Sequence, residues 1–470
     1  MKNLFLLITL LSMGLVSYTQ ITFENDYDGG INDADEGFCM KQTSDGGYIM
    51  SGATWINDNA WYDIALVKVD EEGNFQWTKT FGYGSGNIEV GYGVVETESG
   101  GFMIVGGTDG ITENNEVLAI CTDASGNELW SNHYGGNSED YGHACDNTND
   151  GGFIIAGATS SFGAGMDDAY LIRIDANGNE IWSAAYGTAQ FDYASSVIQT
   201  EDGGFVAAGS SNGDAFIFKT DGDGNELWTK IYGGTANDEI FSIKQTNDGG
   251  YIAAGKNMSE GAGDYDIWLI KLDANGEMTW SQLYGGEKKD QGFSVSICTD
   301  GGYFIAGYTE SFAHAEEDSD TYLIKTNSSG MVQWTKSYGN IADDGAKSGV
   351  QTADGGFAAF GYKYVTGQQL NFYLVKTSPD GLVQTNSIAS NQKSINIFPN
   401  PVQNTAVIEF SNPKNKSYDL IISNISGQIV KRMYAISNNE VIIDRSNLPN
   451  GMYLLELIGN PSFRTKIIIN

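Results

Sequence analysis

Acidic side chains recur at a fixed place along this 470-residue chain, and carboxylates in a regular array could bind a cation. Each lies eleven residues before a Gly-Gly pair, and the seven are Asp35, Glu89, Asp140, Asp192, Asp238, Asp290 and Asp344. Hard oxygen ligands suit Ca²⁺, so one interpretation is a calcium site. The other is structural, because Asp commonly accepts backbone N–H bonds within its own turn. Repetition in every unit favours the structural role, since a ligand site would more plausibly break the symmetry.

A second set of acids stands just before a later strand of six units, and the seventh unit has Asn371 there. Its members are Asp63, Glu116, Asp168, Asp214, Asp266 and Asp320. Strand order places both sets on one face of the expected fold. A pair of carboxylates can hydrolyse a glycosidic bond, but the large number of acids in this sequence gives no reason to choose one particular pair.

Aromatic side chains break the repeat in units 1, 6 and 7. The residues concerned are Trp55, Trp61, Tyr62, Phe312, His314, Tyr362 and Tyr364. These units become neighbours if the repeats form a closed ring. Exposed aromatic side chains on such a rim stack on sugar faces or anchor a protein partner, whereas ordinary loop packing is the alternative. These residues are therefore the candidate ligand site, with loop packing as the open alternative.

Signals for other chemistry are weak. The three histidines, His133, His143 and His314, have no metal-ligand spacing, and no HExxH or phosphate-binding loop occurs. We therefore assign no catalytic residue and expect no cofactor other than Ca²⁺.

The elements that must position these residues come from an internal repeat. A Gly-Gly-aromatic step occurs seven times at spacings of 46 to 54 residues, beginning at Gly46, Gly100, Gly151, Gly203, Gly249, Gly301 and Gly355. A repeat of this period indicates one supersecondary unit per copy.

The fifth unit serves as the pattern for the others. It predicts strands over 240–245, 251–255, 267–272 and 278–284, separated by Gly-containing hairpin turns. A lone four-stranded sheet of this kind cannot bury both faces and must stack on neighbours. The sequence therefore predicts an all-β fold, a seven-bladed β-propeller of four-stranded antiparallel blades over residues 21–386.

Ring closure is predicted from one missing aromatic residue. Six units carry a tryptophan four residues after the second-turn glycine, such as Trp77, but the seventh has Thr385. Phe23 aligns with the tryptophans by its distance to the tyrosine that follows, Tyr27. We therefore expect the N-terminal strand to complete the last blade.

Three strings recur along the units: W-x3-YGG-x3-D, QT-x-DGGY-x2-AG-x-T and D-x-x-L-x-K-x-D-x-x-GN. Units of this form resemble the SBBP-type β-propeller repeats of exported bacterial proteins. The resemblance implies the fold and says little of activity. The string from Lys271 to Trp280 is also similar to the tryptophan-docking repeat of quinoprotein dehydrogenases. Those propellers typically have eight blades and often adjacent cysteines, which this sequence lacks, so a shared hairpin turn explains the string.

The first twenty residues are typical of a secretory signal peptide, with Lys2 before an apolar run over 4–16. No later apolar stretch is long enough to cross a bilayer, so we expect no transmembrane segment in the mature chain. The four cysteines show no disulfide framework and are expected as buried thiols. Charge is uneven: the first 390 residues hold 17 basic and 55 acidic side chains, which favours cationic partners and excludes nucleic acid.

A polar linker over 387–393 precedes a different domain over 394–470. Apolar alternation in six short segments predicts a compact, Ig-like β-sandwich. Three motifs, IFPNPV, NISGQ and LPNGMY, occur in order before a terminal KIII, and they include Pro399, Asn400, Pro401, Gly427, Gly451 and Tyr453.

These motifs resemble the type A C-terminal sorting domain of the type IX (Por) secretion system of Bacteroidota. The resemblance implies that the outer-membrane translocon binds residues 394–470. It also implies export through the periplasm to the cell surface or the medium, usually with removal of the domain. We expect a secreted or surface-bound binding module for a glycan or protein ligand. A secreted polysaccharide hydrolase or lyase that uses the rim carboxylates is the alternative.

Overall fold

Short strands and glycine turns determine how each repeat folds. In the computed structural model of the protein, the residues described are 20–27, 34–55, 62–83, 88–108, 114–316, 318–364, 370–383, 396–398, 400–410, 417–424, 429–445, 448–458 and 463–469. Two compact units are present, residues 1–385 and residues 386–470, and each is described by itself. No helix occurs in the ranges above, and hence none that could cross a membrane.

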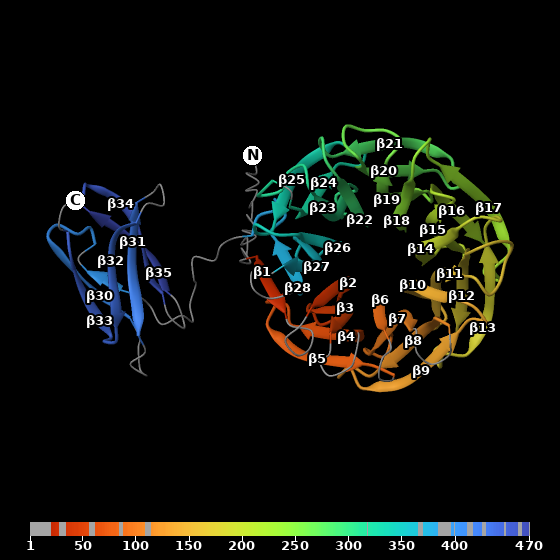
Figure 1. The fold of residues 1–470 in the computed structure, drawn as a ribbon, viewed down its shortest axis with the longest axis horizontal. Coiled ribbons are helices and arrows are strands. Elements are labelled where there is room, and N and C mark those ends of the chain that lie inside the picture. The colour runs from red at the N-terminus through yellow and green to blue at the C-terminus, as the bar shows by residue number, and fades with distance from the viewer. Residues whose placement is uncertain are drawn as a thin grey trace, which may run out of the picture. The chain divides into compact units, whose positions relative to one another are not determined.

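Within the described part, unit 1 contains seven four-stranded antiparallel sheets, which Figure 1 shows around a central opening. In sheet order the strands are β2 (Asp35–Gln42), β3 (Tyr48–Trp55), β4 (Tyr62–Val69), β5 (Phe75–Phe81); β6 (Glu89–Glu96), β7 (Phe102–Thr108), β8 (Glu116–Thr122), β9 (Glu128–Tyr134); β10 (Asp140–Asn147), β11 (Phe153–Thr159), β12 (Asp168–Ile174), β13 (Glu180–Tyr186); β14 (Asp192–Gln199), β15 (Phe205–Ser211), β16 (Asp214–Thr220), β17 (Glu226–Tyr232); β18 (Asp238–Gln245), β19 (Tyr251–Asn257), β20 (Asp266–Leu272), β21 (Met278–Tyr284); β22 (Asp290–Ile297), β23 (Tyr303–Thr309), β24 (Asp320–Thr326), β25 (Val332–Tyr338); and β26 (Asp344–Gln351), β27 (Phe357–Tyr364), β28 (Leu370–Thr377), β1 (Phe23–Tyr27).

Repeated four-stranded antiparallel sheets around an axis make unit 1 a β-propeller. The first strand of each sheet lies nearest the opening, and the second and third strands are almost wholly buried. Neighbouring sheets share apolar cores: Ile252 and Leu269 of one sheet pack with Val295 and Ile305 of the next. Each blade is therefore stabilised by its neighbours rather than by a core of its own.

A recurring staple links each sheet to the next. The Trp280 ring lies against the turn glycine Gly330 of the following sheet, where a Cβ on that glycine would sit 2.8 Å from the ring. Tyr284, four residues after Trp280, donates its hydroxyl hydrogen to the Gly330 carbonyl at 2.6 Å. The positive φ of Gly330, 77°, also favours glycine there.

The N-terminal strand makes the same staple. β1 pairs antiparallel with β28, Phe23 lies against Gly73, and the Tyr27 hydroxyl donates to the Gly73 carbonyl at 2.8 Å. The prediction that the N-terminal segment joins the last sheet is confirmed by this pairing. Across the same junction, the Ala353 N–H donates to Gln42 Oε1 at 2.9 Å, so the first and last repeats are in direct contact.

Residues 386–470 form two sheets around a separate core. The strands are β29 (Asn396–Phe398), β30 (Thr405–Glu409) and β33 (Glu440–Asp444) in one sheet, and β32 (Ile429–Ile436), β31 (Tyr418–Asn424), β34 (Gly451–Ile458) and β35 (Phe463–Ile469) in the other. Ile408, Leu420 and Leu455 are among the fully buried members of the core that both sheets share. β32 is a strand that the sequence pattern did not indicate.

Candidate functional site

The seven predicted rim acids are all buried, at most 1% exposed, and their own loops hold them. Asp238 is representative: its carboxylate accepts hydrogen bonds from the backbone N–H groups of Gly234 at 2.8 Å and Met258 at 2.8 Å, and from the Ser259 hydroxyl at 2.7 Å. Asp290 accepts from the Gly286 N–H at 2.8 Å and the Ser311 hydroxyl at 2.6 Å. This geometry supports the structural interpretation of the rim acids.

Among the described residues, no three His, Cys, Asp or Glu side chains are placed to hold a metal ion together. A calcium site at the rim acids therefore stays a prediction. Burial raises the pKa of Asp344 to about 6, although N–H donors from Asn340 and Tyr364 favour its ionised form. The backbone N–H donors supply hydrogen bonds to this carboxyl from its own loops.

A β-bulge in each innermost strand shapes the central opening. In all seven sheets the register shifts between the second and fourth residues after the rim acid. A bulge leaves one residue unpaired and re-aims its side chain. The third residue after each rim acid consequently lines the central channel; we call these seven residues the collar: Phe38, Tyr92, His143, Ser195, Phe241, Phe293 and Lys347.

The collar is mainly aromatic, and its rings contact one another. Phe38 and Tyr92 lie 4.9 Å apart between ring centroids, and Phe241 and Phe293 lie 5.0 Å apart. The Lys347 ammonium group lies 3.7 Å from the Phe293 ring centroid, within cation–π range. Burial lowers the pKa of His143, and its hydrogen bond with the Ala194 carbonyl offsets this only partly. The collar thus presents apolar ring faces and one cation to the channel.

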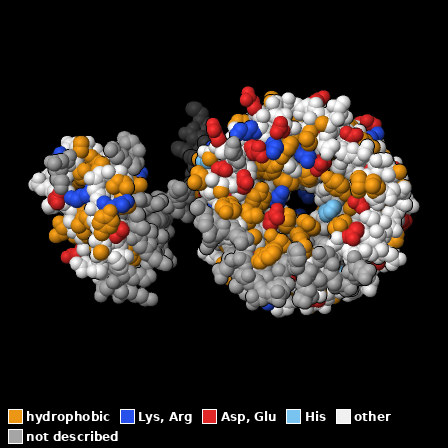
Figure 2. Space-filling model, in the orientation of Figure 1, with side chains coloured by type: hydrophobic (Ala, Val, Ile, Leu, Met, Phe, Trp, Pro, Cys, Tyr) orange, Lys and Arg blue, Asp and Glu red, His pale blue; other side chains and the backbone are white. Residues whose placement is uncertain are grey.

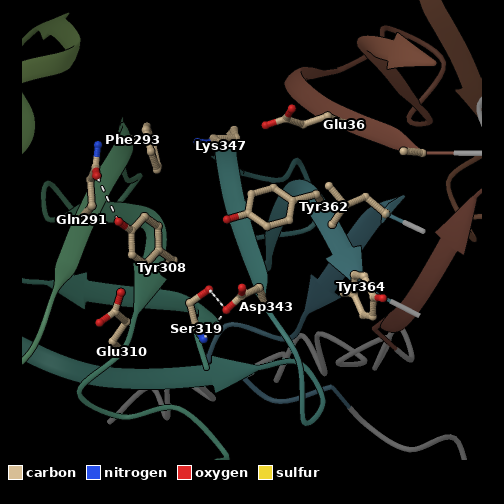
Figure 3. Close-up of a pocket in the computed structure, with 12 residues that line it drawn as sticks. Glu36, Gln291, Phe293, Tyr308, Glu310, Ser319, Asp343, Lys347, Tyr362 and Tyr364 are labelled. Carbon is tan, nitrogen blue, oxygen red and sulfur yellow. Dashed lines mark hydrogen bonds between the residues drawn. The ribbon is translucent and has the colours of Figure 1, made fainter. Parts of the chain in front are cut away.

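Above the collar, a pocket of about 820 Å³ lies between the sheets of units 6, 7 and 1; we call it the mouth pocket. Figure 3 shows Tyr308 and Tyr362 facing the same space. The full lining is Ala34, Glu36, Gln291, Phe293, Tyr308, Glu310, Ser319, Asp343, Lys347, Tyr362, Tyr364 and Leu370. A pocket of this size, with aromatic walls and a few polar groups, is typical of small-ligand sites.

Hydrogen bonds fix some of these side chains. The Tyr308 hydroxyl donates to Gln291 Oε1 at 3.3 Å, and the Ser319 hydroxyl donates to Asp343 Oδ1 at 3.2 Å (Figure 3). Burial raises the pKa of Glu36 and the opposite charge of Lys347 lowers it. Burial likewise lowers the pKa of Lys347 against the effect of Glu36. These opposite charges influence each other across the junction of the mouth pocket and the collar, without an ion pair within 4 Å in the described residues.

A second hollow of about 560 Å³ opens above the collar at units 3 and 4, across the channel axis from the mouth pocket. It is lined by Tyr141, Tyr193 and Asp167, together with collar residues. Figure 2 shows hydrophobic side chains gathered around the central opening. Aromatic surface therefore extends beyond the mouth pocket.

The structure brings together only some of the predicted ligand-site residues. Tyr362 and Tyr364 line the mouth pocket, and Tyr364 is 43% exposed. Trp55 and Tyr62 pair with each other, 5.1 Å between centroids, outside that lining, and Trp61 lies outside the described residues.

Phe312 and His314 pack within their own sheet. Phe312 packs 5.5 Å from Tyr322, and His314 Nδ1 lies 2.6 Å from Asp320 Oδ2. Neither side chain lines the mouth pocket. Burial raises the pKa of Asp320, an effect that its hydrogen bond with His314 opposes.

The sequence pattern did not indicate the collar, Glu36 or Tyr308. One signal was present: the third residue after the rim acid varies through Phe, Tyr, His, Ser and Lys, while its neighbours in the innermost strand are mostly small or aliphatic. Variation at one place in a repeat marks a side chain that does not serve the shared fold.

The strand pairing and the channel define the class of the protein, a β-propeller with an aromatic pocket at its channel mouth. Residues 396–470 match the family described as a secretion system C-terminal sorting domain. The domain indicates export through the type IX system, to the cell surface or beyond, and interaction with its machinery. Of its predicted motif residues, Asn400, Pro401, Gly451 and Tyr453 are described; Pro399 and Gly427 lie outside the described residues.

Several solved structures are similar to the chain at low identity. The Neurospora crassa Pan2 WD40 domain is 10% identical, covers 73% of this chain and 89% of its own, and has a TM-score of 0.46. Sqt1 from Chaetomium thermophilum is 11% identical, with 82% and 97% covered and a TM-score of 0.45. The extracellular domain of a putative hybrid two-component system from B. thetaiotaomicron is 12% identical, with 92% and 68% covered and a TM-score of 0.32. No curated protein matches the chain.

Proposed function

We propose that the protein is an exported glycan-binding module whose ligand binds in the mouth pocket. The single observation that carries the proposal is the pocket between units 6, 7 and 1, where Tyr308, Tyr362 and Tyr364 lie beside Glu36, Glu310 and Asp343. Aromatic faces stack on sugar rings, and carboxylates accept hydrogen bonds from sugar hydroxyls. This combination supports a carbohydrate better than an apolar ligand.

The proposal includes the finer architecture. Unit 1 is a seven-bladed propeller closed by β1, and residues 394–470 form an Ig-like sandwich, in line with the seven sheets and the two-sheet core described above. By resemblance, the repeats are of the SBBP type and the source is a member of the Bacteroidota. After a signal peptide over residues 1–20 delivers the chain to the periplasm, the type IX translocon binds the sorting domain and the propeller reaches the surface or the medium.

The burial and hydrogen bonds of the rim acids support ligand binding rather than hydrolysis. The rim acids are buried, and the carboxylates of Asp238 and Asp290 are engaged by backbone and hydroxyl donors of their own loops. A general acid and a nucleophile must instead face the scissile bond. We therefore assign no reaction to these carboxylates.

An array of glycans and peptides, probed with the purified full chain in the presence and absence of Ca²⁺, tests the proposal. We expect glycan binding that Tyr362→Ala weakens about tenfold or more, because an aromatic anchor contributes more than ~1 kcal/mol. The matched control is Phe75→Ala, which removes a 54% exposed aromatic side chain from the outer strand β5 and should leave binding unchanged.

Three outcomes would contradict the proposal. They are turnover of any polymer on the array, binding of peptides alone, and equal affinity for the Tyr362→Ala variant and the unchanged chain. Thermal unfolding of both variants distinguishes a lost contact from a lost fold.

A further inference from the structure

Below the collar, the channel contains lysines, although unit 1 carries most of the acidic residues of the chain. The channel encloses about 230 Å³ and is lined by innermost strands of all seven sheets. Lys41 of β2, Lys244 of β18 and Asp146 of β10 all stand at the sixth position after a rim acid, and with Lys347 they are the charged residues of the lining. Figure 2 shows Lys or Arg side chains within the central opening. The channel therefore holds three cations and one anion.

These partly buried lysines differ from the fully buried cations of the propeller. Lys68, Lys219, Lys271, Lys325, Lys376 and Arg173 each form an ion pair with an Asp of a glycine turn. Across the described ranges, no hydrogen bond and no ion pair within 4 Å is found for the ammonium groups of Lys41, Lys244 or Lys347. A cation withdrawn from water is costly unless it is paired.

Lys41 and Lys244, the two lysines below the collar, repel each other electrostatically across the channel. Burial, followed by the like charge of Lys41, lowers the pKa of Lys244 to about 8. Burial also opposes the charge of Lys41, but Cys39 and Asp146 outweigh it, so the pKa of Lys41 is raised. One carboxylate is thus shared between two ammonium groups, and a second anion would relieve their repulsion.

The acidic exterior does not prevent an anion from binding there. At physiological ionic strength the Debye length is about 8 Å, so exposed acids outside the ring are largely screened from the axis. Inside the channel, where water is limited, nearby ammonium groups dominate the potential.

We propose that the channel binds one small oxyanion, a phosphate, sulfate or carboxylate group, between the ammonium groups of Lys41 and Lys244. The site is separate from the mouth pocket and does not depend on the identity of a glycan ligand. The oxyanion is either a free ion or the charged end of a longer ligand that passes the collar.

Isothermal titration of the full chain with inorganic phosphate and with inorganic sulfate tests the proposal. We expect one site for at least one of these ions, and at least tenfold weaker binding for Lys41→Met and for Lys244→Met. Lys288→Met is the matched control, because Lys288 is exposed in a loop between sheets. Tyr362→Ala should leave the affinity for the ion unchanged, so failure of the mouth-pocket proposal is distinguishable from failure of this one.

A uronic acid tetrasaccharide, compared with the free monosaccharide, identifies the source of the anion. If the tetrasaccharide binds more tightly than the monosaccharide, and Lys244→Met removes this difference, the anion is the charged end of a longer ligand. If the tetrasaccharide and the monosaccharide bind equally, the site takes a free ion. The proposal is overturned if neither ion binds, or if the Lys41→Met and Lys244→Met variants, shown to be folded by their thermal unfolding, bind as tightly as the unchanged chain.

Discussion

At the scale of single residues, ion pairs explain the lysine of the Lys-x-Asp string of the repeat. Lys271 of β20 contacts Asp248 at 3.0 Å and donates to the Leu272 carbonyl at 3.0 Å, which ties the first glycine turn to the third strand. Five other sheets carry the same pair, with Arg173 replacing Lys in one of them. The similarity to the quinoprotein repeat therefore has a structural cause in these blades.

The Asp248 carboxylate predicts a specific pH dependence of stability. Thr246 and Lys271, with the Gly250 N–H, outweigh burial and lower the pKa of Asp248 from 3.8 to about 2. A carboxyl with a lowered pKa stabilises the fold above its unfolded pKa, and this contribution is lost as the pH falls from about 4 to 2. Asp248→Asn should lower the free energy of unfolding by about 1 kcal/mol or less at pH 7, because the Asp248 side chain is 64% exposed and solvent screens the pair.

Urea titration of both proteins at pH 7 and at pH 2.5 measures this effect. The difference between them should shrink at the lower pH. Glu260→Gln, which changes an exposed acid with no ion pair among the described residues, should show no such dependence. An Asp248→Asn effect of equal size at both pH values would contradict the ion-pair account.

At the scale of elements, β1 is a full member of the ring despite its distance along the chain. Phe23 replaces the tryptophan of the other outer strands, and Tyr27 stands where five of them have a tyrosine and β5 has Phe81. β1 also covers the edge of β28, and an exposed strand edge is a site for aggregation.

Equivalence of β1 to the other outer strands is tested by two matched substitutions. Tyr27→Phe and Tyr284→Phe each remove one hydroxyl bond to a turn-glycine carbonyl, to Gly73 and Gly330 respectively. Each should lower the free energy of unfolding by about 1 kcal/mol. A cost for Tyr284→Phe alone would mean that β1 is not docked in solution.

The sequence predicts the positions of the strands more accurately than the residues of the ligand site. The strands expected in the fifth unit differ from β18 to β21 by at most two residues, because apolar alternation and glycine turns are local signals. β32 was missed because it is largely exposed and carries Lys431 and Arg432, which obscure the alternation.

The collar was not predicted because a bulge depends on how two strands pair, and pairing is not a local property. Of the predicted ligand residues, Tyr362 and Tyr364 lie in the mouth pocket. Trp55, Phe312 and His314 instead pack within their own sheets, since exposure of a loop aromatic depends on neighbours that the sequence does not show.

At the scale of the whole molecule, the two units have different tasks. Residues 1–385 and 386–470 each have their own apolar core. The propeller carries the channel, whereas residues 396–470 match the sorting-domain family. Separate cores mean that removal of one unit should leave the other folded.

Deletion of residues 387–470 should stop export without unfolding the propeller. We expect the truncated chain to accumulate in the periplasm, while the full chain reaches the surface or the medium. Cell fractionation with a periplasmic marker measures the distribution, and thermal unfolding of the truncated chain provides the control. Surface exposure of a truncated, folded propeller would show that another part of the chain directs its export.

A crystal structure of the full chain with the tightest glycan from the array tests the central claim most directly. The account predicts sugar density in the mouth pocket, stacked on Tyr308, Tyr362 or Tyr364. Density on the opposite face of the ring, on the outer strands or on residues 396–470, with the mouth pocket holding only solvent, would contradict it.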